Sequence, residues 1–263
     1  MKDVPEFTVA VAAMEAGRHD EALAAVLAAF ERFDRGDHDA PRVFFTLFLW
    51  ELLLACHAPA RTALVMARDA QLQRVLAGDI ELPPGGEPPR RRRLDLVVEL
   101  NALLGDLAAT YQLYQRLRDE QPALARSIAW RAAPAILDAG DFALAEQLVP
   151  DPLPRLAYVN EIAASMPLYP RRREPPRLSA ELSNLMGEVR HRAQALQGLG
   201  RAAEAEQLRR AALDGLANDA LRELAQAELV EAGAISRIIA EQQVAFEEQE
   251  EADKLSRQPV QPD

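Results

Sequence analysis

The sequence predicts an all-α fold in which the chain folds back repeatedly as paired antiparallel helices. Ala and Leu dominate a composition that is 49% hydrophobic and only 5% aromatic, and both residues lose little conformational freedom on entering a helix. Runs of β-branched residues with a period of two, which would indicate strands, do not occur. We therefore expect about 11–12 helices and no sheet.

A recurring step between apolar, helix-forming stretches predicts the pairing. In each step a glycine is followed five positions later by a small residue: Gly17 and Ala22, Gly105 and Thr110, Gly140 and Ala145, Gly200 and Ala205. Glycine accepts the positive φ that the turn between two helices requires. A small residue one turn into the returning helix lets the two backbones approach closely. Each step therefore predicts a helix hairpin.

The helices of the first 150 residues follow from these steps and from the prolines. Pro41 suits the first turn of a helix, and Pro122 stops one. Pro134 lies inside a helical pattern and predicts a kink or a late start. The expected helices cover residues 7–16, 20–33, 42–57, 60–77, 94–104, 107–120, 123–138 and 142–149.

The remaining helices follow a short helix that is an insertion relative to the repeat. Ser179 is a good N-cap residue, and Asn218-Asp219 caps a later helix. The expected helices cover residues 155–166, 179–199, 202–216, 219–231 and 234–255. We expect one domain over residues 1–255, with loop insertions near 78–93 and 150–178, and a disordered tail over 256–263.

At these offsets the chain resembles the tetratricopeptide repeat family, a helix–turn–helix repeat of about 34 residues. Measured from each glycine, the small residue seven positions earlier is present at Ala10, Ala133 and Ala193 but is replaced by Val98. The aromatic residue that the family has four positions before the glycine is absent from all four units. The resemblance implies a right-handed α-solenoid and a groove that binds a protein or peptide.

Charge and cysteine content limit the environment and the partners. The net charge is −11, with the acidic excess at the two ends of the chain, which disfavours binding to phosphate backbones. Cys56 is the single cysteine, so a reducing compartment is natural and we expect a cytoplasmic protein. The longest apolar run, residues 43–56, is shorter than the roughly 20 residues of a membrane span and predicts a buried core helix.

Metal and nucleophile motifs are weak. The His-Asp pairs lack the apolar helical context of a metal dyad, Glu-x-x-His occurs once where a di-iron bundle needs two, and the lone Cys-His pair has no second Cys. We expect no metal, no cofactor and no catalytic residue. The pairs are His19-Asp20, His38-Asp39, Glu188 with His191, and Cys56-His57.

Two arginine runs in the proline-rich insertions are the candidate binding residues. They either are solvated loops or dock an acidic partner, including the acidic ends of a second copy of this chain. The candidates are Arg90, Arg91, Arg92, Arg93, Arg171, Arg172 and Arg173.

The leading functional expectation is a non-enzymatic scaffold or adaptor that binds a protein or peptide through its groove or its proline-arginine loops. Self-association is compatible with the apolar first helix. An all-helical, metal-dependent, hydrolase-like enzyme and a nucleic-acid-binding helical repeat protein are the alternatives that the sequence leaves open.

Overall fold

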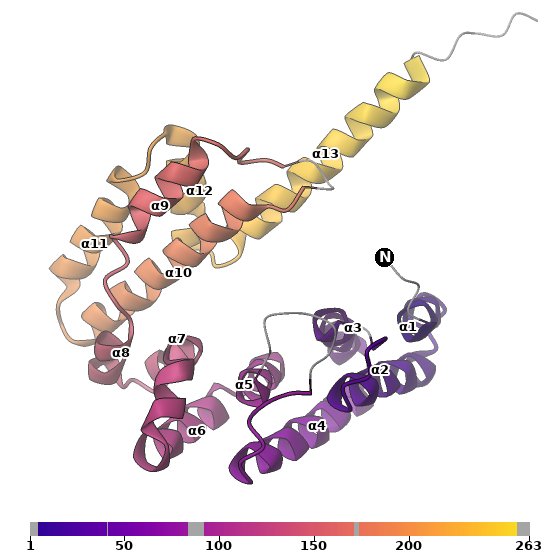
Figure 1. Ribbon diagram of the computed structural model, residues 1–263. Coiled ribbons are helices and arrows are strands. Elements are labelled where there is room, and N and C mark those ends of the chain that lie inside the picture. The colour runs from indigo at the N-terminus through magenta and orange to yellow at the C-terminus, as the bar shows by residue number, and fades with distance from the viewer. Residues whose placement is uncertain (1–4, 41, 84–91, 171–173, 257–263) are drawn as a thin grey trace, which may run out of the picture. The chain divides into compact units, whose positions relative to one another are not determined.

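The computed structural model describes residues 5–40, 42–83, 92–170 and 174–256, which form helices joined by short connections (Figure 1). Thirteen helices lie in these ranges, one for each expected range, so the expected total of about 11–12 was too low. The described residues contain no strand, although Glu81 and Arg92 form an isolated antiparallel bridge. The all-α prediction is therefore confirmed. Of the predicted disordered tail, residues 257–263 lie outside the described residues.

The helix bounds agree closely with the expected ranges. The helices are α1 (Pro5–Glu15), α2 (His19–Asp34), α3 (Val43–Cys56), α4 (Ala58–Leu76), α5 (Arg93–Leu104), α6 (Leu107–Glu120), α7 (Pro122–Asp138), α8 (Phe142–Leu148), α9 (Arg155–Ala163), α10 (Arg177–Gly198), α11 (Ala202–Asp214), α12 (Asp219–Val230) and α13 (Ala234–Ser256).

Two compact units share the chain, residues 1–135 and 136–263. The division falls within α7, directly after Ala135, and so next to Pro134, which has no N–H to give to the helix. The helix nevertheless begins at Pro122 and continues through Pro134 to Asp138, so the expected late start does not occur. The predicted single domain, 1–255, thus contains two such units.

In the first unit each helix from α1 to α5 packs on the next one along the chain, and α1 also packs on α3. The core that α1 to α5 share includes Val26, Trp50, Leu53 and Leu64, all at most 1% exposed. Trp50 meets the ring of Phe30 edge to face at 5.5 Å. This burial of large apolar side chains is the main stabilising term for the unit.

The two ends of the first insertion, after α4 and before α5, are joined to each other by backbone hydrogen bonds. We call these joined ends the closed stem. Glu81 and Arg92 form the antiparallel bridge, and the Arg93 N–H donates to the Ile80 carbonyl at 2.8 Å. Leu82 is only 5% exposed. The ends of this segment, for which the sequence predicts a loop insertion near 78–93, pack against the unit because backbone hydrogen bonds and an apolar side chain hold them there.

In the second unit α10 is the central helix, since α8, α9, α11, α12 and α13 all pack on it. Its buried residues include Leu182, Leu185 and Val189, each 0% exposed. At the end of α10, Gly198 lies under the ring of Phe142 on α8, so close that a Cβ there would lie 2.2 Å from ring atoms. Only glycine fits this contact without a shift of the ring.

The inserted helix α9 is held to the second unit by a side-chain amide. Asn160 donates from Nδ2 to the Gly215 carbonyl at 2.8 Å and accepts from the Ala217 N–H at 2.9 Å. Arg155 at the start of α9 pairs with Glu181 and Glu188 of α10. The insertion therefore carries a helix that is built into the unit.

The glycine steps have the predicted local structure in all four places. The glycines have φ values of +69° to +78°, and the small residues five positions later are 0–2% exposed. In each turn the N–H of the residue after the glycine donates to the carbonyl five positions earlier, at 2.8–3.1 Å. These are the bonds of a glycine-terminated helix end.

Replacing Ala205 by Leu is expected to lower the free energy of unfolding by about 1–3 kcal/mol, because the added atoms have no space in a filled site. Ala205 is 0% exposed and packs with Ala193 of α10. Urea denaturation followed by circular dichroism measures the change. Ala203→Leu on the exposed face of the same helix is the control. Equal effects of the two variants would contradict the close approach.

Three side-chain caps and one correction complete the helix ends. Asn218 accepts from the Leu221 N–H at 3.0 Å, as predicted, and Asp106 and Asp141 cap α6 and α8 in the same way. Ser179 does not cap α10, and that prediction is wrong. The helix begins two residues earlier, and the Ser179 hydroxyl donates to the Pro176 carbonyl instead.

Candidate docking surface

The first arginine run ends in a buried side chain. Arg93 is 0% exposed. Its guanidinium donates to Asp34 Oδ1 at 2.7 Å, to the Asp79 carbonyl at 3.1 Å and to the Gln71 side chain. Because every partner belongs to the same unit, Arg93 is part of the interior and has no surface to offer a partner.

Arg92 is likewise engaged within the unit. Its guanidinium makes two hydrogen bonds to the Asp95 carboxylate, at 3.0 and 2.9 Å, and one to the Ser127 carbonyl. These contacts tie the start of α5 to α7. Arg90 and Arg91, and the second run Arg171, Arg172 and Arg173, lie outside the described residues. The two described arginines of the run therefore stabilise the fold.

The structure brings together two of the weak motifs that the sequence separates. His57 Nε2 lies 3.1 Å from Asp20 Oδ1, without hydrogen-bond geometry, and its ring centroid is 5.8 Å from that of His19. Cys56 is exposed beside this group. Among the residues that the structure describes, however, no three His, Cys, Asp or Glu side chains are placed to hold a metal ion.

The Glu-x-x-His pair on α10 is also engaged elsewhere. Glu188 forms an ion pair with Arg155 of α9. Burial, and after it the charge of Arg190, lowers the pKa of His191, so its imidazole is neutral at pH 7. His38 and Asp39 lie 3.8 Å apart, and both are largely exposed. Neither pair has both of its side chains free of other partners and shielded from water, as the ligands of a metal centre are.

Helix α3 has three large apolar side chains exposed along one side, next to the exposed Glu51. Phe44, Phe48 and Leu52 follow one another at intervals of four residues and are 65%, 47% and 42% exposed. The opposite face contains Leu47, Trp50 and Leu53, each at most 4% exposed. The expected buried core helix is thus buried on one side only, because α1, α2 and α4 pack on that side.

A second large aromatic side chain is exposed on α7. Trp130 is 65% exposed, and the Arg131 guanidinium lies 4.4 Å from the centroid of its ring. Arg131 is held in turn by Asp95 at 3.4 Å. A stacked arginine and an exposed tryptophan are enriched among the residues that dominate protein interfaces.

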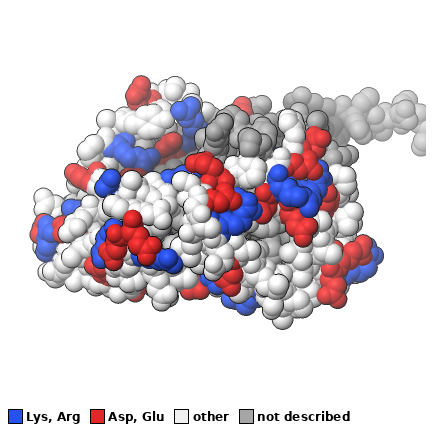
Figure 2. Space-filling view, turned by 60° about the horizontal axis from the view of Figure 1, so that its bottom comes forward, with Lys and Arg blue, Asp and Glu red and all other residues white. Residues whose placement is uncertain are grey.

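The charge on the surface offers no comparable feature in the view of Figure 2. Lys and Arg lie in small groups next to Asp and Glu on that face, and no broad area of positive charge appears. Ion pairs between neighbouring charged side chains occur among the described residues, for example Arg201 with Glu204 and Arg116 with Glu120. Among the described residues, no helix has the length and apolar content that crossing a membrane would need.

Sequence reasoning did not find the exposed face of α3. The helix is apolar except for Thr46 and Glu51, so its periodicity is weak. Glu51 is exposed and lies three positions after Phe48, on the same side of the helix. The signal that was present is the spacing of Phe44, Phe48 and Leu52, one turn apart along one side.

Comparisons with protein-family models, with curated proteins and with solved structures give no match to this chain.

Proposed function

We propose that this protein is a non-enzymatic scaffold or adaptor that binds a partner protein through the outer face of α3. We call this face, Phe44, Phe48 and Leu52, the α3 face. The observation that carries the proposal is the exposure of three large apolar side chains in a row on a helix whose other side is fully packed. Exposed apolar surface of this kind marks interaction sites in soluble proteins.

A helical-repeat scaffold, a right-handed α-solenoid of antiparallel pairs, belongs to the same proposal. Four glycine turns with buried small residues support it. So does the order in which α1 to α6 pack, each on the next. The resemblance to tetratricopeptide repeats adds that such scaffolds bind proteins. The single cysteine, Cys56, supports a cytoplasmic setting.

The α3 face fits an amphipathic helix of the partner. Its three side chains extend over nine residues, and the first and last are eight residues apart, which is about 12 Å along the helix. Side chains four residues apart form a ridge that fits between the ridges of another helix. A partner helix with apolar residues at positions i, i+4 and i+7 would cover this ridge. Trp130 is a second anchor for a partner that binds the first unit.

The test is loss of binding without loss of fold. The triple variant Phe44→Ala, Phe48→Ala, Leu52→Ala is expected to weaken partner binding by about 2 kcal/mol or more, roughly 30-fold. Affinity purification with mass spectrometry from the native organism identifies the partners that the wild type captures. Titration calorimetry with the partner's helix then gives the affinities.

Met66→Ala is the matched control, because Met66 is an apolar side chain of the same unit that is 69% exposed and lies on α4. It is expected to retain every partner. Both variants should melt within a few degrees of the wild type, since none of the changed residues is buried. Equal recovery of all partners by the triple variant and the wild type would refute the assignment of the α3 face.

A further inference from the structure

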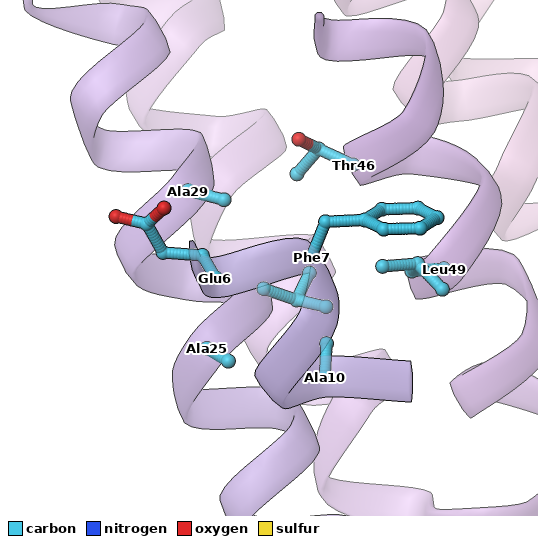
Figure 3. Close-up of a pocket in the computed structure, with 8 residues that line it drawn as sticks. Glu6, Phe7, Ala10, Ala25, Ala29, Thr46 and Leu49 are labelled. Carbon is cyan, nitrogen blue, oxygen red and sulfur yellow. The ribbon is translucent and has the colours of Figure 1, made fainter. Parts of the chain in front are cut away.

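The pocket in Figure 3 lies between α1, α2 and α3, and its wall includes Phe7, Ala10 and Leu49. Its accessible lining is apolar, and its volume is about 200 Å³ with the opening to solvent included. Sites for small molecules are larger, roughly 300–1,000 Å³, and contain polar groups that orient the ligand. This pocket is therefore a gap in the packing of three helices and not a binding site.

The exposed side of α7 carries a tryptophan between two arginines. Arg126 and Trp130 lie four residues apart, on the same side of the helix, and both are exposed. Arg126 forms no hydrogen bond or ion pair with the part of the chain that the structure describes. The Arg131 guanidinium lies over the Trp130 ring, 4.4 Å from its centroid. We call these three residues the α7 surface.

The α7 surface is positively charged on a chain whose net charge is −11. Asp95 lies 3.4 Å from Arg131 but also accepts two hydrogen bonds from Arg92, so one carboxylate faces two guanidinium groups. Arg126 adds a further positive charge, and residues 122–137 contain no acidic side chain. This surface is complementary to a segment that is acidic and carries an exposed apolar side chain.

The second half of α13 has that composition. Residues 240–256 contain six acidic side chains and one lysine, and therefore a net charge of −5. Val244 is 55% exposed, and it lies on the same side of the helix as the exposed Glu241 and Glu248, three residues after the first and four before the second. An apolar side chain thus lies between two carboxylates, as Trp130 lies between two guanidinium groups.

This half of α13 is scarcely packed in its own unit. The helix packs on α10 and α12 through its first turns, where Ile235 and Ile239 are buried. Over residues 240–249 no side chain that the structure describes is buried, and the helix continues past its neighbours (Figure 1). Gln243 donates to the Pro170 carbonyl at 3.5 Å, from a different side of the helix than Val244. Because helices in proteins owe most of their stability to packing, this segment is suited to pack on another chain.

We propose that the α7 surface binds residues 240–256 of a second copy of this chain. The apolar side chain of α13 packs on the open face of the Trp130 ring, and the two carboxylates beside it pair with the two guanidinium groups. Each copy carries both parts, so two copies form two such contacts and close a symmetric dimer. The second copy is then the partner that Trp130 anchors. The contact leaves the α3 face open and does not rest on its role.

Charge reversal on each side of the contact tests the proposal. Arg126→Glu, and separately the double variant Glu241→Arg, Glu248→Arg, place like charges opposite each other. Each is expected to weaken self-association about ten-fold or more, which sedimentation velocity of the full chain over a range of concentrations measures. An equimolar mixture of the two variants is expected to restore association, because opposite charges then face each other in both contacts.

Arg116→Glu is the matched control, because Arg116 is a half-exposed arginine of α6 in the same unit. It should self-associate like the wild type, and so should the triple variant of the α3 face, which separates this contact from the proposed function. All the variants should melt close to the wild type, since none of the changed residues is buried.

Two results would overturn the proposal. One is a wild type that stays monomeric at every concentration, as when α13 binds within its own chain or another protein's acidic segment occupies the α7 surface. The other is a mixture of the two charge-reversal variants that associates no better than either variant alone.

Discussion

The variant Arg93→Met is expected to lower the free energy of unfolding by about 3–5 kcal/mol. The guanidinium is 0% exposed and binds Asp34, Gln71 and the Asp79 carbonyl. Methionine fills a similar volume but leaves these acceptors without their donor in a low-dielectric interior. Urea denaturation of the full chain, followed by circular dichroism, gives the change.

The environment of Arg93 also predicts the result of two comparison variants. Arg93→Lys keeps the charge but lacks the planar fork, so it recovers only part of the loss. Arg116→Met removes an ion pair with Glu120 in which both side chains are about half exposed, and this is expected to cost less than about 1 kcal/mol. If Arg93→Met and Arg116→Met cost the same, Arg93 does not support the fold from the interior.

Trp50→Ala is expected to cost about 3–5 kcal/mol, the usual loss when a large aromatic side chain is removed from a core. Trp50 is 0% exposed, stacks edge to face on Phe30, and donates from Nε1 to the Ala60 carbonyl at 3.0 Å. The deletion thus leaves a cavity between α2, α3 and α4. A thermal melt of the full chain measures the loss.

Leu52→Ala on the opposite side of the same helix is the control for Trp50→Ala. Leu52 is 42% exposed, so its truncation should change the free energy of unfolding by about 0.5 kcal/mol or less. The contrast between the two variants follows from the two faces of α3. A loss of several kcal/mol for Leu52→Ala would mean that the α3 face is covered in the folded protein.

The parts of the fold that the sequence predicts are those fixed by local geometry. A positive φ at Gly17 or Gly105 needs glycine whatever surrounds it, and a helix that returns close by needs Ala22 or Thr110. The predictions at these positions were therefore correct, since the glycines have φ near +70° and the small residues are buried. The helix ranges depend on the same turns and prolines, which explains their agreement.

The parts that the sequence does not predict depend on contacts between distant segments. Arg93 is buried because Asp34 and Gln71, 59 and 22 residues away along the chain, provide its acceptors. His57 lies next to Asp20 because, in space, the end of α3 at Cys56 is close to the start of α2 at His19. A run of arginines in a proline-rich segment contains no information on such partners.

Because the first insertion has a closed stem, a change in its length has little effect on the stability of the helices. Its two ends are joined by the Glu81–Arg92 bridge and by the Arg93 N–H to Ile80 carbonyl bond. Because the ends are already together in the folded state, each doubling of the residues between them adds only about 0.6 kcal/mol of loop-closure entropy. Evolution can therefore lengthen, shorten or exchange residues 84–91 at little cost to stability, and a protein engineer can insert a tag or a binding peptide there.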